Sequence, residues 1–174
     1  MSVGHETQSV WYAVRTRPRH ERVVKSLLTE KKVKVFLPEH RVWSCRCDRR
    51  ETISVPLFPS YLFVASDSDG EYFRQVKWTR GVINILGVNG RPLLVPNCEI
   101  ESIQILMASG ESMSPVSTLV PGNRVRVIEG PLTGAEGKVV RRGKRSRLIV
   151  TVELLQRSVA VELAEYQLEK VKNS

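Results

Sequence analysis

The pattern of apolar residues changes once along this chain of 174 residues, and the change divides the sequence into two parts. Up to about residue 108, helical and strand periods alternate. Beyond Val120 the apolar residues fall in short alternating runs that glycines separate, which is typical of a small β-barrel with tight turns. Between the parts, residues 109–118 contain Gly110 and Pro115 and lack an apolar period, which predicts a linker.

The first part predicts an α/β sandwich, in which helices flank an antiparallel sheet. Trp11 to Arg15 indicates a strand, and residues 19–31 a helix with an apolar stripe at Val23, Val24, Leu27 and Leu28. Residues 61–64 are apolar throughout, as in a strand covered on both faces. The further elements expected here are strands at 33–37, 41–43, 52–55 and 82–86, and helices at 69–77 and from residue 96 onward.

The second part predicts only strands, so the chain as a whole belongs to the α+β class. The expected strands are 125–128, 138–140, 148–152 and 159–161. The sequence therefore predicts a disordered terminus at 1–9, an α/β domain at 10–108, a linker at 109–118 and a small SH3-like β-barrel domain at 119–174.

The formal charge of +9 and the pI near 9.8 favour an anionic partner, most commonly nucleic acid, although a basic protein without such a partner has the same composition. No stretch approaches the roughly 20 apolar residues that cross a bilayer. Three cysteines are too few for a disulfide framework. We therefore expect no membrane association and a cytoplasmic location.

The sequence offers no catalytic or metal-binding arrangement. Cys45, Cys47 and His40 lack the fourth ligand and the paired spacing of a structural zinc site, so they are interpreted as parts of a hairpin and its tip. His5 and His20 have no recognisable nucleophile beside them, and no phosphate-binding glycine loop is present. We expect no enzyme activity, no metal and no cofactor.

Two stretches resemble a known family. Residues 57–64, Leu-Phe-Pro-Ser-Tyr-Leu-Phe-Val, followed by Thr-Arg-Gly-Val at 79–82, are similar to the NusG N-terminal (NGN) domain, and residues 121–137 are similar to the opening of a KOW domain. The residues of the first motif are more similar to those of the operon-specific RfaH and UpxY antiterminators than to those of housekeeping NusG. The resemblance implies a monomeric transcription elongation or antitermination factor that binds RNA polymerase. The alternative is a KOW-type RNA-binding or ribosome-associated protein that does not contact polymerase.

The resemblance also implies a docking surface for the clamp helices of the largest catalytic polymerase subunit. Tyr61 and Phe63 lie two apart on one strand and so face the same side. Exposed aromatic rings there would anchor a protein partner; the alternative, that both rings belong to the core, stays open. The implied polymerase-binding residues are Leu57, Phe58, Pro59, Tyr61, Phe63 and Arg80.

Two basic clusters are candidate nucleic-acid contacts, the first for displaced single-stranded DNA and the second for RNA. A solvated basic face is the alternative for each. The candidates are Arg15, Arg17, Arg19, His20 and Arg22 near the first helix, and Arg141, Arg142, Lys144, Arg145 and Arg147 in a loop of the second part.

The resemblance places a further contact at Leu154, Leu155 and Arg157, where the KOW domain would meet a small-subunit ribosomal protein or the Rho termination factor. Leu155 replaces a phenylalanine of housekeeping NusG, which makes Rho a doubtful partner, and both leucines could instead belong to the core. RfaH covers its polymerase site with a C-terminal helical hairpin. Residues 146–163 are strongly β-branched here and predict strands, so we expect no such autoinhibition.

Overall fold

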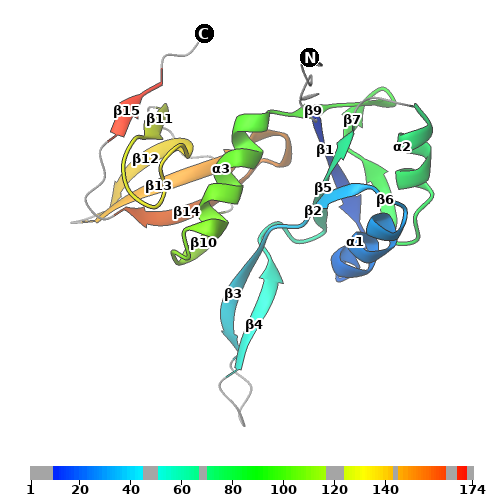
Figure 1. The fold of residues 1–174 in the computed structure, drawn as a ribbon, viewed down its shortest axis with the longest axis horizontal. Helices are drawn as coiled ribbons and strands as arrows, with labels where there is room; N and C mark the ends of the chain where they lie inside the picture. The colour runs from blue at the N-terminus through cyan, green and yellow to red at the C-terminus, as the bar shows by residue number, and fades with distance from the viewer. Residues whose placement is uncertain are drawn as a thin grey trace, which may run out of the picture. The chain divides into compact units, whose positions relative to one another are not determined.

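The computed structural model describes residues 10–44, 51–66, 70–116, 124–142, 145–163 and 168–171. The chain divides into two compact units (Figure 1). The first unit comprises Met1–Leu37 and Pro59–Pro96, and the second Pro38–Phe58 and Asn97–Ser174. The predicted disordered terminus at 1–9 and the predicted hairpin tip with Cys45 and Cys47 lie outside the described residues.

The first unit is built on an antiparallel sheet in the order β2-β5-β1-β6, with β9 also paired to β1. Its elements are β1 Val10–Thr16, α1 Glu21–Glu30, β2 Lys34–Phe36, β5 Tyr61–Ser66, α2 Gly70–Lys77, β6 Val82–Ile85, β7 Gly87–Val88, β8 Arg91–Pro92 and β9 Leu94–Val95. The predicted alternation of strands and helices in this part of the chain is confirmed.

A core of aliphatic side chains joins the helices to one face of this sheet. Val24 and Leu28 of α1 and Val76 of α2 are fully buried with Leu62 and Val64 of β5. The 3.6-residue period of α1 produces this contact because residues four apart lie on the same side of a helix. Val23, which the sequence placed in the same stripe, is instead half exposed.

The opposite face of the sheet is also apolar and buried. Trp11, Ala13 and Phe63 are each buried there, and the Phe63 ring lies 6.1 Å from that of Phe36, centroid to centroid. Because β5 is buried at successive positions from Leu62 to Ser66, both of its faces are covered. This confirms the prediction made from the continuous apolar run.

The second unit contains a hairpin, one helix and a six-stranded antiparallel sheet, hereafter the C-terminal sheet. The hairpin is β3 Glu39–Ser44 with β4 Glu51–Pro56, and the helix is α3 Asn97–Ala108. The C-terminal sheet has the order β10-β14-β13-β12-β11-β15. Its elements are β10 Met113–Val116, β11 Arg124–Val127, β12 Glu136–Arg142, β13 Arg145–Val152, the 3-10 helix η1 Glu153–Leu155, β14 Arg157–Leu163 and β15 Leu168–Lys170.

The strands predicted for the second part are confirmed, including those at 146–163 in place of a helical hairpin. The pairings among the described residues follow an open path from β10 to β15 and do not close. An antiparallel sheet is therefore shown, while closure into a barrel stays a prediction.

Two boundaries differ from those expected. Within the predicted linker at 109–118, Met113–Val116 form strand β10 and pair with β14. The expected α/β domain at 10–108 includes the β3–β4 hairpin and ends with α3, yet both fall in the second unit, where α3 contacts β12 and β13. An apolar helix beside a polar stretch does not reveal which sheet it covers.

A membrane span requires both length and apolar character in one helix, and none of the described helices meets both requirements.

Candidate functional site

Three turns of the first unit meet at one end of its sheet, hereafter the basic edge. The backbone N–H of Thr16 donates to the carbonyl of Ser60 at 2.9 Å, and that of Arg17 donates to the carbonyl of Gly81 at 2.8 Å. The strand register also pairs Arg15 with both Tyr61 and Asn84. The antiparallel arrangement therefore brings together the end of β1 and the starts of β5 and β6, which are far apart in sequence.

Gly81 permits the close approach of the β1–α1 turn. Its φ of +96° is unfavourable for residues with a side chain, and a Cβ there would lie 2.9 Å from Val24 Cγ2 and 3.4 Å from His20 Cβ. The ring nitrogen Nδ1 of His20 lies 3.0 Å from the carbonyl oxygen of Pro18. Since a carbonyl can only accept, Nδ1 carries the proton in this contact.

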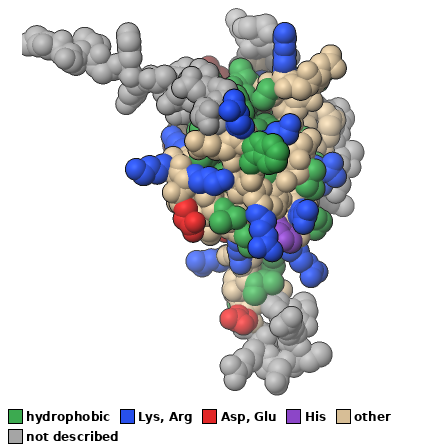
Figure 2. All heavy atoms as spheres, turned by 90° about the vertical axis from the view of Figure 1, so that its right-hand side faces the viewer, with side chains coloured by type: hydrophobic (Ala, Val, Ile, Leu, Met, Phe, Trp, Pro, Cys, Tyr) green, Lys and Arg blue, Asp and Glu red, His purple; other side chains and the backbone are tan. Residues whose placement is uncertain are grey.

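The basic edge gathers the cations that the sequence singled out near the first helix, together with Arg80. His20 is half-buried, whereas the arginines at 15, 17, 19, 22 and 80 are exposed. Glu21, next to them in sequence, is buried, and its Oε1 accepts a hydrogen bond from the Ser60 backbone N–H at 2.7 Å. Figure 2 shows Lys and Arg side chains spread over this side of the molecule, with a histidine among them. Such a surface favours anionic partners.

Trp78 is a candidate contact that the sequence reasoning missed. Its side chain is 80% exposed immediately after α2, two residues before Arg80. The signal was available in the sequence, because Tyr72, Phe73 and Val76 define the inward side of α2 and position 78 falls outside that period. An exposed indole two residues from an exposed arginine is suited to stacking on a nucleic-acid base.

The predicted apolar docking surface is largely absent. Leu57, Phe58 and Phe63 are each at most 1% exposed, so their assignment as exposed polymerase contacts is wrong for this structure. For Phe63 the physical reason is that both faces of β5 are covered. Pro59 is exposed and Tyr61 is half-buried, so these two and Arg80 are the members of the predicted set that a partner can reach.

The basic loop of the second part is only partly described. Arg147 is half-buried and donates from Nη2 to Glu162 Oε1 at 3.1 Å across β13 and β14, so this cation has an internal partner. Lys144 lies outside the described residues, and Arg141, Arg142 and Arg145 fall at the paired ends of β12 and β13. RNA contact by this loop stays a prediction.

The predicted KOW contact residues surround η1. Leu155 is only 9% exposed and belongs to the core, so its assignment as a partner contact is wrong for this structure. Leu154 and Arg157 are half-buried. In the turn between β13 and β14, one of the two leucine side chains is buried against the sheet. The sequence did not indicate which of the two this would be.

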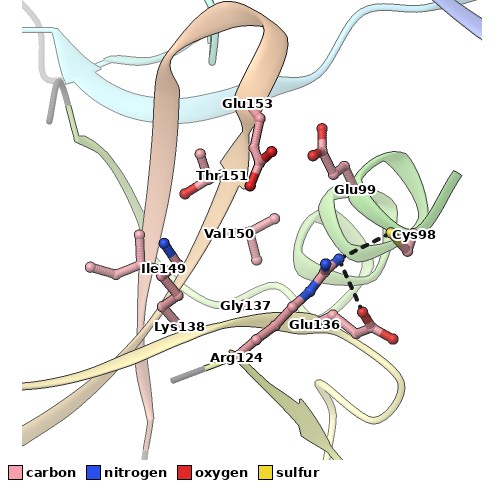
Figure 3. Close-up of a pocket in the computed structure, with 10 residues that line it drawn as sticks. All are labelled: Cys98, Glu99, Arg124, Glu136, Gly137, Lys138, Ile149, Val150, Thr151 and Glu153. Atoms are coloured by element: carbon pink, nitrogen blue, oxygen red, sulfur yellow. Dashed lines mark hydrogen bonds and ion pairs between the residues drawn. The ribbon is translucent and has the colours of Figure 1, made fainter. Parts of the chain in front are cut away.

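A second arrangement of charged groups lies in the second unit, where α3 packs on the C-terminal sheet. Its hollow of about 50 Å³ is lined by residues of α3, β11, β12, β13 and η1 (Figure 3). Arg124 Nη2 lies 3.2 Å from Cys98 Sγ and 3.3 Å from Glu136 Oε2. Ser102 Oγ accepts from the Glu136 backbone N–H at 2.8 Å, which fixes α3 to β12.

Glu99 is the most perturbed group of this hollow. Its side chain is 7% exposed, and Oε2 is buried without a hydrogen-bond partner in the described structure. Burial raises the pKa of Glu99 from 4.5 to about 7. The Glu153 backbone N–H, donating to the carboxyl group, and the Arg124 charge lower the pKa, while the Glu153 carboxylate raises it.

Comparison with known proteins gives a consistent result. The family model described as "Transcription termination factor nusG" matches residues 9–104. The chain is 30% identical to the transcription termination/antitermination protein NusG of Escherichia coli (strain K12), over 92% of this chain and 95% of that protein. It is 29% identical to the protein of the same description from Pseudomonas aeruginosa, over 92% of this chain and 98% of that protein.

Among solved structures, the chain is similar to one described as "Domain interaction in Thermotoga maritima NusG". The TM-score is 0.56 at 22% sequence identity, with 95% of this chain and 98% of that chain covered. At this identity the likeness concerns the fold, and it extends over both units of the chain.

Proposed function

The chain belongs to the NusG family of transcription termination and antitermination factors, and from this premise we propose that it regulates elongation by binding RNA polymerase through its first unit. The observation that carries the proposal is the basic edge. Two groups of residues adjoin there. The family resemblance assigns one group to the polymerase clamp helices, namely Pro59, Tyr61 and Arg80. The other group is the arginines assigned to displaced DNA.

The contact surface is smaller and more polar than the sequence predicted. An arginine and a half-buried tyrosine are both common anchors of protein interfaces, because each combines apolar contact with a directed hydrogen bond. Arg80 follows Thr79, which is buried and hydrogen-bonded to the Gln75 carbonyl, so the backbone that presents Arg80 is held in place. The edge therefore offers a preorganised contact without an apolar groove.

The mechanism needs binding and no chemistry. The first unit would hold the polymerase clamp closed and so oppose the opening that accompanies pausing. A preference of about 1.4 kcal/mol for the closed clamp changes the ratio of closed to open clamp tenfold. The C-terminal sheet would close into a KOW barrel that recruits RNA or a small-subunit ribosomal protein at high local concentration. Such a factor acts in the cytoplasm.

Charge reversal at Arg80 tests polymerase binding. We expect Arg80→Glu to lower retention of the protein on immobilised core polymerase by about tenfold, because it replaces a charge-assisted contact by a repulsive one. The matched control is Lys25→Glu, which makes the same change at an exposed cation of α1. If Arg80→Glu and Lys25→Glu are retained equally on the polymerase, the basic edge is not the polymerase-binding site.

The indole of Trp78 provides a separate test of DNA binding. We expect Trp78→Ala to weaken binding of a fluorescein-labelled single-stranded DNA by about tenfold in an anisotropy titration at low salt, because base stacking on an aromatic ring is lost. Trp43→Ala is the control, since Trp43 of the β3–β4 hairpin is similarly exposed but lies outside the basic edge. The same loss in both variants would show that exposed indoles bind DNA without regard to position.

A further inference from the structure

A hollow of about 430 Å³ opens in the first unit between α2, β6 and the β7–β8 hairpin, and it shares with the basic edge Asn84, which pairs with Arg15. This volume falls in the range of small-molecule sites in proteins, about 300–1,000 Å³. The residues that line it are Phe73, Arg74, Lys77, Asn84, Ile85, Gly87, Gly90, Arg91 and Pro92.

The charged groups of this hollow are all cations. Arg74 and Lys77 come from α2 and Arg91 from β8, and no carboxylate is among the lining residues that the structure describes. Cations in the last turn of a helix often interact with the unpaired carbonyl groups at the helix end. Here Lys31 of α1 donates from Nζ to the Gln75 carbonyl at 3.3 Å, and Arg91 belongs to another element. The cations that line the hollow therefore come from two separate elements, α2 and β8.

The hairpin holds Arg91 in a defined position. Val88 pairs with Arg91 across a two-residue turn in which Asn89 and Gly90 have φ of 50° and 76°, as a tight type I′ turn requires. Gly87 is needed for the close approach of the two strands, because a Cβ there would lie 2.1 Å from the Arg91 carbonyl oxygen. The backbone of Arg91 is thus held at the rim of the hollow, so less backbone entropy is lost there on binding.

The walls of the hollow are apolar and include one amide. Phe73, Ile85 and Pro92 provide apolar surface, and Asn84 adds a group that both donates and accepts hydrogen bonds. Phosphate groups suit the arginine and lysine side chains, and a planar base suits an apolar wall with a nearby amide. We propose that this hollow binds a nucleoside polyphosphate, with its phosphates between α2 and Arg91.

The number of cations favours a polyphosphate over a passing nucleic-acid backbone. A backbone phosphodiester brings one negative charge per nucleotide, whereas adjacent phosphates of a polyphosphate place several charges in one hollow and match the cations that line it from two elements. The same chemistry exists in a free nucleoside triphosphate and at the 5′-triphosphate end of a transcript, and the experiment separates these two sources.

The test is a titration of the full-length protein with a fluorescent GTP analogue that carries the N-methylanthraniloyl group on its ribose. We expect saturable binding that weakens by about tenfold in Arg91→Ala and in Lys77→Ala, because each removes a charge-assisted contact to phosphate. Lys25→Ala is the matched control, since it removes an exposed cation of α1 outside the hollow. Far-UV circular dichroism checks that each variant is folded.

Competition then identifies the source of the triphosphate. Displacement by unlabelled GTP but not by a 5′-triphosphorylated RNA oligonucleotide assigns the hollow to the free nucleotide, and displacement by both adds the transcript end. The proposal is overturned if the analogue does not bind, if both hollow variants bind it as the wild type does, or if 5′-hydroxyl RNA competes as well as 5′-triphosphate RNA. None of these results bears on polymerase binding at Arg80.

Discussion

Replacing Phe63 with alanine is expected to destabilise the protein by about 3–5 kcal/mol, the usual cost of deleting a fully buried ring. Phe63 is 0% exposed, pairs with Ala13 and Phe36 across the sheet and lies 6.1 Å from the Phe36 ring. A domain is stable by only about 5–15 kcal/mol, so this cost removes a large part of the free energy of unfolding. Urea unfolding followed by far-UV circular dichroism measures the change.

The control is Tyr61→Ala, on the same strand and the same face. Tyr61 is half-buried at the basic edge, so its loss should cost much less stability than the loss of Phe63 while still reducing polymerase retention. The two variants therefore separate a core residue from a contact residue. A Phe63→Ala protein within 1 kcal/mol of the wild type would contradict the buried position and restore the predicted aromatic docking surface.

Glu99 is expected to make the packing of α3 depend on pH. Its pKa is about 7 in the folded protein against 4.5 ordinarily, so the folded state holds a proton that the unfolded state releases between these values. Its contribution to stability is therefore fully present below pH 4.5, falls as the pH rises, and reaches its lowest value above pH 7. The loss by pH 8 is about 3 kcal/mol, since each pKa unit corresponds to about 1.4 kcal/mol.

Glu99→Gln should abolish this dependence, because glutamine resembles the protonated carboxyl group and carries no charge. We expect the variant to be more stable than the wild type at pH 8 by about 2–3 kcal/mol, with little difference at pH 4.5. Hydrogen exchange of the α3 amides at both pH values measures it. Glu101→Gln is the matched control, exposed on the same helix. If Glu99→Gln instead destabilises α3 at pH 8, the ionised carboxylate is well satisfied there, and the raised pKa is contradicted.

The Glu99 result illustrates a limit of local reasoning. A glutamate in the first turn of a helix is ordinarily favoured in its charged form, because the helix dipole is positive there. In this fold the dominant effect is burial against the C-terminal sheet, together with the Glu153 carboxylate, and both raise the pKa. Neither contact can be inferred from the spacing of residues 97–108.

The strand at Met113–Val116 shows a second limit. Serines and a proline in this segment predict a loop, because proline cannot donate a backbone hydrogen bond. Among the strands that the structure describes, β10 lies at the end of the sheet and pairs with β14 alone, so Pro115 is tolerated there. Whether such a segment pairs depends on a free neighbouring strand edge, which is a property of the folded sheet.

By itself the sequence determined the family, most of the longer strands and helices and the presence of basic residues near the first helix, because these depend on local periods, turn residues and motifs. Tertiary structure decided which faces are covered. It buried Phe63 and Leu155, left Trp78 exposed, joined Gly81, next to Arg80, to the β1–α1 turn and placed α3 on the C-terminal sheet. The period of a strand shows which side chains share a face, but only the elements packed on that face decide whether a partner can reach them.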